Sequence, residues 1–170
     1  FGIGQGLVSA SPLQIAQMTS TIANGGYKIK PHLMYAIEKS NGEIIKNPVY
    51  TEKIDWVKDY YLTSVKEGMR QNVIEGSGRF YGPIPDIEIA GKTGTAQNPF
   101  GFSHGWYTSF APYDNPEIVV TAFIENAGWA SVSAVPVASL IIEKYLTGEI
   151  KRQWIYDRVI NFEAKEDNSE

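Results

Sequence analysis

The sequence lacks cysteine, an excess of positive charge, and long apolar runs. None of its 170 residues is a cysteine, which excludes disulfide bonds, thiolate zinc sites and a cysteine nucleophile. The formal net charge is −4, so a nucleic-acid partner bound through its phosphates is not expected. No apolar run approaches the roughly 20 residues that cross a bilayer. The two histidines, His32 and His104, have no carboxylate spaced to form a local metal motif, so we predict no metal site.

The start of the sequence is unlike the start of a complete protein. It opens at Phe1 without an initiator methionine, and it lacks the basic start of a signal peptide. We therefore expect a segment of a longer protein, with parts of its active site elsewhere. Hydrophobic residues make up 43% of the sequence and charged residues 20%, a composition typical of one globular domain.

Hydrophobic patterning predicts an α+β domain in which helices flank an antiparallel sheet. Ser11-Pro12-Leu13-Gln14 is a helix start with a capping box, and Asn41-Gly42 is typical of a hairpin turn. Gly76-Ser77-Gly78 ends the second helix. The domain spans residues 1–162, and the acidic segment 163–170 is predicted to be a disordered tail. We expect helices over 12–23, 55–73 and 133–146, a hairpin over 27–45, and a meander of strands over 87–97, 106–111 and 117–125.

A polar cluster inside the first strand of this meander is the candidate binding and catalytic site. Gly91 and Gly94 bracket Lys92 and Thr93, and glycine weakens a strand unless a ligand or another backbone must come close. Side-chain alternation puts Lys92 and Gly94 on one face and Thr93 and Thr95 on the other. On an edge strand, the two hydroxyls can bind a carboxylate while a main-chain N–H meets a developing oxyanion. One such donor is worth about 3 kcal/mol in acyl transfer.

The same residues allow other interpretations. A phosphate-binding loop requires a glycine at position 86, where this sequence has Asp86, so that interpretation fails. Gly2, Gly4 and Gly6 do not have the spacing of a dinucleotide-binding fingerprint. A solvated edge strand protected by Lys92 stays open as an alternative, because four residues of common type do not distinguish it from a site.

The residues around the cluster resemble the transpeptidase domain of class B penicillin-binding proteins. The strand resembles the Lys-Thr-Gly motif of that family, and Glu125-Asn126-Ala127-Gly128-Trp129 suggests its elongation-type branch, similar to penicillin-binding protein 2. Several motifs in register are more specific than any one of them. The others that occur in the family's order are Gly4-Gln5-Gly6, Ser11-Pro12-Leu13-Gln14, Asn24-Gly25-Gly26, Lys30-Pro31-His32-Leu33, Val65-Lys66-Glu67-Gly68-Met69, His104-Gly105-Trp106, Phe110-Ala111-Pro112 and Asp114-Asn115-Pro116.

The resemblance implies part of the penicillin-binding transpeptidase fold, which serine β-lactamases share, and a role for each residue of the motif. Lys92 supports the hydrogen bonds and the field of the active site. Thr93 binds the carboxylate of the terminal D-alanine or of the antibiotic, with Thr95 as a second candidate. The Thr95 N–H forms half of the oxyanion hole, and Gly94 leaves room for the substrate to lie along the strand.

Two residues beyond the motif are further candidates. Gln97, two positions after Thr95, is a candidate for substrate binding. His104 precedes the next strand, and it either lines the cleft or is a loop histidine that shapes the turn.

The resemblance also implies partners and a location. The intact protein would cross-link D-Ala-D-Ala stem peptides of peptidoglycan, be acylated by β-lactam antibiotics, and work with a cell-wall glycosyltransferase. It would lie at the periplasmic face of the inner membrane, held by an upstream anchor. No metal or organic cofactor is implied.

The nucleophile of the family is absent from the sequence. The family uses Ser-x-x-Lys, in which the serine attacks and the lysine helps to remove its proton. No serine here has a lysine three positions on, and no Ser-x-Asn is present. Because both motifs precede the Lys-Thr-Gly strand in the family, we expect truncation, and we predict that the chain itself cannot be acylated. The alternatives are a non-catalytic β-lactam or muropeptide sensor and a β-lactamase of the same fold.

Overall fold

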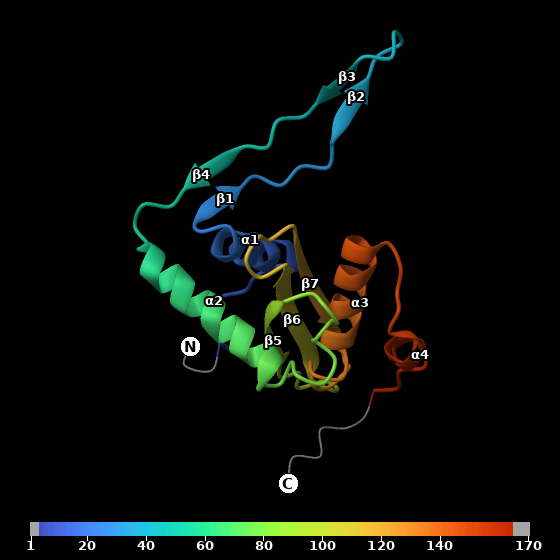
Figure 1. Ribbon diagram of the computed structural model, residues 1–170. Coiled ribbons are helices and arrows are strands. Elements are labelled where there is room, and N and C mark those ends of the chain that lie inside the picture. Colours follow the sequence, from blue (N-terminus) through green and yellow to red (C-terminus); the bar gives the residue numbers. More distant parts are fainter. Residues whose placement is uncertain (1–3, 165–170) are drawn as a thin grey trace.

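The computed structural model describes residues 4–164, which form an α+β domain (Figure 1). The predicted fold class is confirmed. The acidic tail predicted for 163–170 lies, from residue 165 onward, outside the described residues. Among residues 4–164, no helix has the length and apolar character needed to cross a membrane. The elements are α1 (Pro12–Ala23), β1 (Tyr27–Ile29), β2 (Ala36–Glu38), β3 (Ile44–Lys46), β4 (Thr51–Lys53), α2 (Asp59–Ile74), β5 (Ala90–Ala96), β6 (His104–Ala111), β7 (Ile118–Ile124), α3 (Ala134–Thr147) and α4 (Gln153–Ile160).

The central sheet has three strands in the order β5-β6-β7, and both pairs are antiparallel. The predicted meander is therefore confirmed, and β5 is an outer strand. β5 begins three residues after the predicted Ile87, because Ile84 and Ile87 form an isolated bridge around a turn at Asp86, whose φ is 60°. β6 begins at His104, two residues earlier than predicted, because its pairing with β5 extends to Ala96.

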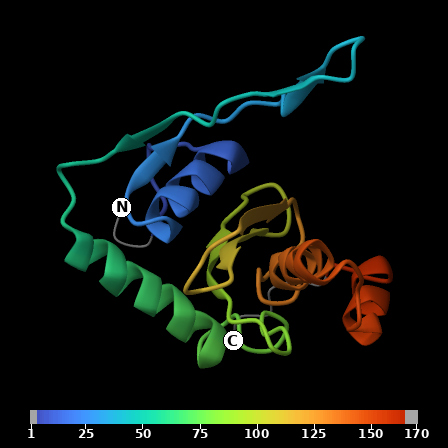
Figure 2. The same ribbon diagram turned by 45° about the horizontal axis from the view of Figure 1, so that its top comes forward.

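Two hydrophobic clusters, one on each face of the sheet, hold the helices in place. α3 packs on the face that carries Tyr107, whereas α1 packs through Ala23 on the face that carries Phe110. α2 lies along β5 and contributes Met69 to the second cluster and Val73 to the first. Figure 2 shows the sheet between α1 and α2 on one side and α3 on the other. Burying one large apolar side chain stabilises the fold by about 1.5–3 kcal/mol.

The ends of the helices follow their capping residues. Gln14 N–H donates to Ser11 Oγ at 3.3 Å, and Ser11 N–H donates to Gln14 Oε1 at 2.7 Å, which confirms the predicted capping box. α3 ends at Gly148, whose φ of 80° favours glycine. The predicted start of α2 was wrong by four residues, because residues 55–57 form a turn and the helix begins at Asp59.

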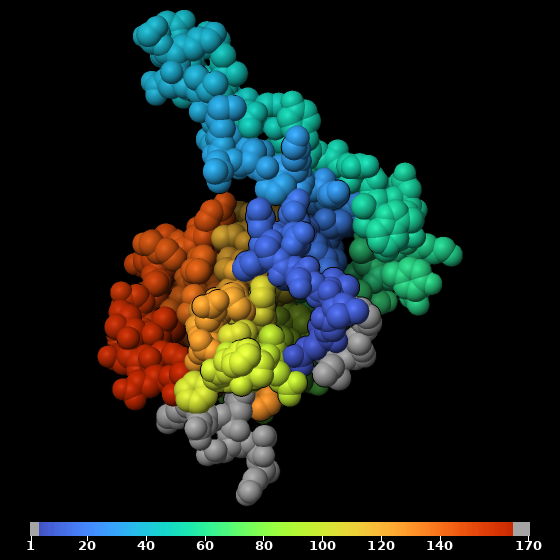
Figure 3. Space-filling model, turned by 180° about the vertical axis from the view of Figure 1, so that it is seen from behind, coloured from blue at the N-terminus to red at the C-terminus, as the bar shows by residue number. Residues whose placement is uncertain are grey.

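Residues 27–53 form a long two-stranded ribbon that projects from the rest of the molecule (Figures 1 and 3). β1 pairs with β4 and β2 pairs with β3. The predicted turn is confirmed: Gly42 has a φ of 82°, and Glu43 N–H donates to Asn41 Oδ1 at 3.0 Å. The prediction ended at Ile45 and missed the return through β4. A strand of three residues is too short for a side-chain alternation to reveal it.

The last helix, α4, was not predicted. It is anchored by Arg152, which is buried just before the first turn. Burial lowers the pKa of Arg152, and the neighbouring Glu143 carboxylate acts in the opposite direction. Because two of the partners of Arg152, the carbonyls of Tyr81 and Pro83, lie far from it in the sequence, no local pattern indicates the whole anchor. The guanidinium donates to Glu143 Oε2 at 3.1 Å and to the carbonyls of Tyr81, Pro83 and Ser139.

Candidate active site

The two glycines of the polar cluster on β5 have different surroundings. A Cβ on Gly91 would overlap the hydroxyl of Tyr107, whose side chain is fully buried. Burial raises the pKa of this tyrosine well above its usual range, so the hydroxyl is neutral. A Cβ on Gly94 would meet only Trp106 Cβ, at 3.4 Å, which is an ordinary contact. Packing therefore requires Gly91, whereas it does not explain Gly94.

The main-chain groups along β5 point alternately toward β6 and toward the outer edge of the sheet. Thr95 lies two residues from Thr93 and two from Gln97, so its N–H shares the direction of the groups at those positions. Main-chain groups at three odd-numbered positions bond to side chains and not to the main chain of β6: Ile89 O accepts from Arg70 Nη1 at 3.3 Å, Thr93 O accepts from Lys92 Nζ at 2.6 Å, and Gln97 N–H donates to Gln5 Oε1 at 3.1 Å. The Thr95 N–H therefore points to the outer edge.

The predicted alternation of Lys92 and Thr93 between the two faces of the sheet follows from the register. Lys92 is paired with Thr108, and Thr93 is paired with Tyr107. Thr108 Oγ1 lies 2.7 Å from Thr19 Oγ1 on α1, so Lys92 is on the face that α1 covers. Thr93 is on the face that α3 covers. The exposed Lys92 side chain turns back along the strand to the carbonyl of Thr93.

Ser77, which the sequence indicated only as part of a helix end, lies beside the predicted carboxylate-binding threonine. Its Oγ is 2.5 Å from Thr93 Oγ1, and Asn72 Nδ2 donates to the same Oγ at 3.1 Å. Sixteen residues separate Ser77 from Thr93. No pattern within a helix or a strand relates residues at that distance, so the sequence carried no signal for this contact.

Gln97 forms hydrogen bonds with Gln5 of the Gly-Gln-Gly segment near the N-terminus. Besides the main-chain contact described above, Gln5 Nε2 donates to Gln97 Oε1 at 3.4 Å. The structure thus brings two of the resembling motifs together at the end of β5. The side chain and the N–H of Gln97, a predicted substrate-binding residue, both face Gln5.

His104 is bonded to the loop after β7. Asn126 N–H donates to His104 Nδ1 at 3.0 Å, so the ring carries its hydrogen on Nε2, and the ring stacks edge-on against Phe123 at 5.5 Å. Asn126, with a φ of 52°, also accepts from Asn98 Nδ2 at 2.7 Å. Figure 3 shows the yellow-green segment near residue 100 beside this orange loop. These contacts support the interpretation of His104 as a residue that shapes the turn.

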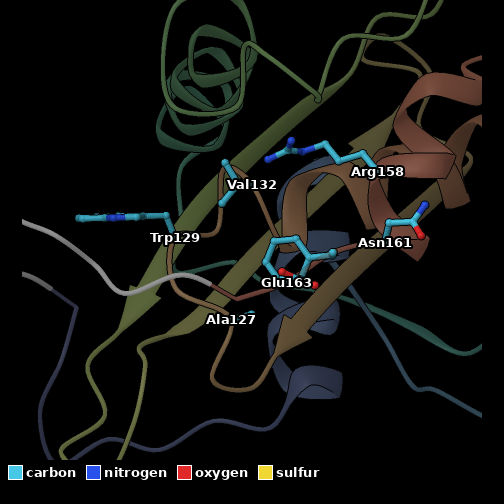
Figure 4. A pocket seen from close by; sticks show the side chains of 7 residues that line it. Ala127, Trp129, Val132, Arg158, Asn161 and Glu163 are labelled. Carbon is cyan, nitrogen blue, oxygen red and sulfur yellow. The ribbon is translucent and has the colours of Figure 1, made fainter.

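A pocket of about 520 Å³ lies beside α4 and does not include the predicted strand residues. Figure 4 shows Arg158 and Asn161 from the C-terminal helical segment and Trp129 and Val132 from the loop before α3. Ala127, Phe162 and Glu163 complete its lining. The predicted site on β5 is therefore separate from this pocket.

A helix-covered antiparallel sheet with Gly-Lys-Thr-Gly-Thr on its outer strand is the arrangement expected of the penicillin-binding transpeptidase fold. The family profile described as "Penicillin binding protein transpeptidase domain" matches residues 1–143, and the chain belongs to this family. A curated relative, the peptidoglycan D,D-transpeptidase MrdA of Haemophilus influenzae, is 36% identical over 186 residues, which cover 99% of this chain and 28% of the relative. This match supports the elongation-type branch.

Solved structures agree with this assignment. Penicillin-binding protein A of Mycobacterium tuberculosis, in an imipenem acyl-enzyme complex, has a TM-score of 0.72 and 30% identity, and the match covers 85% of this chain and 33% of that one. A peptidoglycan synthase complex that coordinates polymerization and crosslinking has a TM-score of 0.68 and 34% identity, covering 84% of this chain and 25% of that one. The chain thus spans about a quarter to a third of the length of the relatives it matches.

Proposed function

We propose that this chain supplies the substrate-binding strand of a serine D,D-transpeptidase that cross-links peptidoglycan. The observation that carries the proposal is the outer edge of β5, where the Thr95 N–H and the Thr93 carbonyl share one direction and Lys92 lies beside them. The nucleophilic serine and its lysine would come from residues outside this chain, since no Ser-x-x-Lys occurs in it.

The outer edge of β5 suits a stem peptide that binds as an added strand. Gly94 leaves open space over the strand, which a side chain would otherwise fill. The Thr95 N–H would donate to the carbonyl oxygen of the scissile bond, which becomes an oxyanion when the serine attacks. Such a donor acts more strongly on the transition state than on the ground state, by about 3 kcal/mol.

The charged end of the substrate would be bound by the two residues before Gly94. The Thr93 hydroxyl would donate to the carboxylate of the terminal D-alanine, and the Lys92 ammonium would add a positive charge nearby. Attack by the serine would release D-alanine and leave an acyl-enzyme. The amine of a neighbouring stem peptide would then take the acyl group, which forms the cross-link and frees the serine.

The proposal extends to the partners and the location of the longer protein: it would bind β-lactams, work with a glycosyltransferase and lie at the periplasmic face of the inner membrane. An acyl-enzyme with imipenem is known for the M. tuberculosis relative, and another relative takes part in a complex that coordinates polymerization with crosslinking. For the protein that contains this segment, we propose acylation by β-lactams and a complex with a glycosyltransferase. Residues outside this chain would anchor it in the membrane.

The proposal is tested by intact-mass measurement after penicillin treatment, on this chain and on the longer protein expected to contain it. A penicilloyl adduct on the longer protein alone is the expected result. An adduct on this chain would overturn the assignment of the nucleophile to residues elsewhere. No adduct on either would favour a non-catalytic relative, and rapid loss of the adduct would favour a β-lactamase.

A further inference from the structure

A loop after α2 meets β5 through a pair of hydroxyls. Ser77 Oγ and Thr93 Oγ1 are 2.5 Å apart, and this is the hydrogen bond that residues 4–164 offer to the Thr93 hydroxyl. Ser77 is exposed and Thr93 is half-buried. The pair therefore lies at the surface, where a ligand can reach it, and the direction of this bond determines where the Thr93 proton points.

The loop that carries Ser77 is wrapped closely around Asn72. Asn72 O accepts from Gly78 N–H at 3.1 Å. A Cβ on Gly76 would lie 2.8 Å from Asn72 Cα, and a Cβ on Gly78 would lie 3.0 Å from Asn72 Oδ1. Since neither glycine has room for a side chain, the two glycines let the loop close on Asn72 and hold Ser77 in one position.

Asn72 donates one hydrogen bond to the Ser77 hydroxyl. Its Nδ2 donates to Ser77 Oγ at 3.1 Å, while its Oδ1 is buried without a hydrogen-bond partner in the described part of the chain. The reverse orientation of the amide would bury an NH₂ group without an acceptor. Buried N–H groups without a partner are rarer than under-satisfied carbonyls, so Nδ2 is the atom that faces Ser77.

One direction of the Ser77–Thr93 hydrogen bond leaves the Thr93 proton available to a ligand. A serine hydroxyl has one proton to donate and two lone pairs to accept. Because Ser77 accepts from Asn72, its own proton is available for Thr93 Oγ1. When Ser77 donates this proton to Thr93 Oγ1, the proton of Thr93 is free for a ligand. With the opposite direction, Thr93 would present only lone pairs to a carboxylate, which would be repulsive.

We propose that Ser77 is a positioning residue that makes the Thr93 hydroxyl a donor toward the substrate carboxylate. The inference rests on the proposed function, in which Thr93 binds the carboxylate of a stem peptide or of a β-lactam. A hydrogen bond to a charged acceptor is roughly twice as strong as one between neutral groups. The orientation of this proton therefore matters more for a carboxylate than for a neutral ester. Ser77 acts through Thr93 and does not itself need to touch the substrate.

The experiment measures second-order acylation rates of the longer protein with benzylpenicillin and with its methyl ester. Ser77→Ala should slow acylation by benzylpenicillin by about tenfold and leave the rate with the ester nearly unchanged. Ser77→Thr, which keeps the hydroxyl, should restore most of the rate. Ser64→Ala is the matched control, because Ser64 is exposed on α2 and donates to Tyr60 O within the same helix.

A double-mutant cycle separates a positioning role from a general structural one. If Ser77 acts through Thr93, Ser77→Ala should have little further effect in a Thr93→Ala background. Equal slowing with both substrates, additive effects in the cycle, or an unchanged rate in Ser77→Ala would each overturn the inference. A parent protein that takes no penicilloyl group would instead overturn the proposed function, and this inference with it.

Discussion

The sheet region and the ribbon of residues 27–53 differ in how their apolar side chains meet water. Tyr107, Phe110 and Ile142 in the sheet region have no exposed area. On the ribbon, Leu33 is fully exposed and Tyr35 is 73% exposed. Because apolar side chains stabilise a fold only when they leave water, these ribbon side chains do not stabilise the chain as it stands.

The comparison separates groups that hold the fold from groups available for contacts. The sheet region is held by partners within the described residues, whereas the ribbon and the outer edge of β5 present apolar and polar groups to the surroundings. Contiguous exposed apolar side chains are typical of interaction surfaces. Substitutions in the sheet region should therefore lower the free energy of unfolding, and substitutions on the ribbon or the outer edge should change binding.

The largest expected effect is in the buried ion pair that anchors α4. Arg152→Ala should lower the free energy of unfolding by about 3–5 kcal/mol, because it leaves the buried Glu143 carboxylate without its partner. Urea unfolding followed by circular dichroism measures this. In the control Lys151→Ala, the lost partner is Glu149, 3.8 Å away on an exposed side chain, and the change should be close to zero. Equal effects would contradict the anchoring role.

The second-largest effect is expected on the rate of acylation and not on the stability of the fold. In the longer protein, Lys92→Ala should slow acylation by penicillin about a hundredfold, which is typical of losing one stabilising group in acyl transfer. The melting temperature should change little, because the side chain is exposed. Time-resolved intact-mass measurement follows the adduct. Lys39→Ala on the ribbon removes the same charge and should leave the rate as it was. Unchanged acylation in Lys92→Ala would remove Lys92 from the site.

The third effect compares the two glycines of β5. Gly91→Ala places a methyl group against the buried Tyr107 and should cost about 1–3 kcal/mol of unfolding free energy. Gly94→Ala meets only an ordinary contact, so its cost should be within about 0.5 kcal/mol. Thermal unfolding of both variants makes the comparison. In the longer protein, Gly94→Ala should nevertheless slow acylation, and an unchanged rate would show that no substrate lies over this position.

The smallest effect on stability is expected on the ribbon. We expect the isolated chain to self-associate through its exposed apolar side chains. Replacing Leu33 and Tyr35 together by serine should weaken this association, while the free energy of unfolding changes by no more than about 0.5 kcal/mol. Sedimentation over a range of concentrations measures the association. A parent chain that stays monomeric at high concentration would contradict this expectation.

The features that the sequence predicted are those with short-range causes. The capping box of Ser11 and Gln14 and the turn at Gly42 each depend on a few neighbouring residues, and both are confirmed. The candidate strand, including Lys92, also came from the sequence, because its residue types and the flanking motifs are contiguous. The prediction of where α2 begins was less accurate, because Lys58, the residue before the helix, forms no side-chain cap that would mark its start.

The tertiary structure decided which of these residues meet. It alone placed Ser77 against Thr93, Gln5 against Gln97 and Arg152 against the carbonyls of Tyr81 and Pro83, because each contact joins segments that are separated along the sequence. It also determined which main-chain groups of β5 face outward, since that depends on the register with β6 and not on the residue types. The sequence by itself thus determined the family, the local turns and the residues available for chemistry. Packing decided their directions and their neighbours, because contacts between distant residues depend on the whole sheet and its helices.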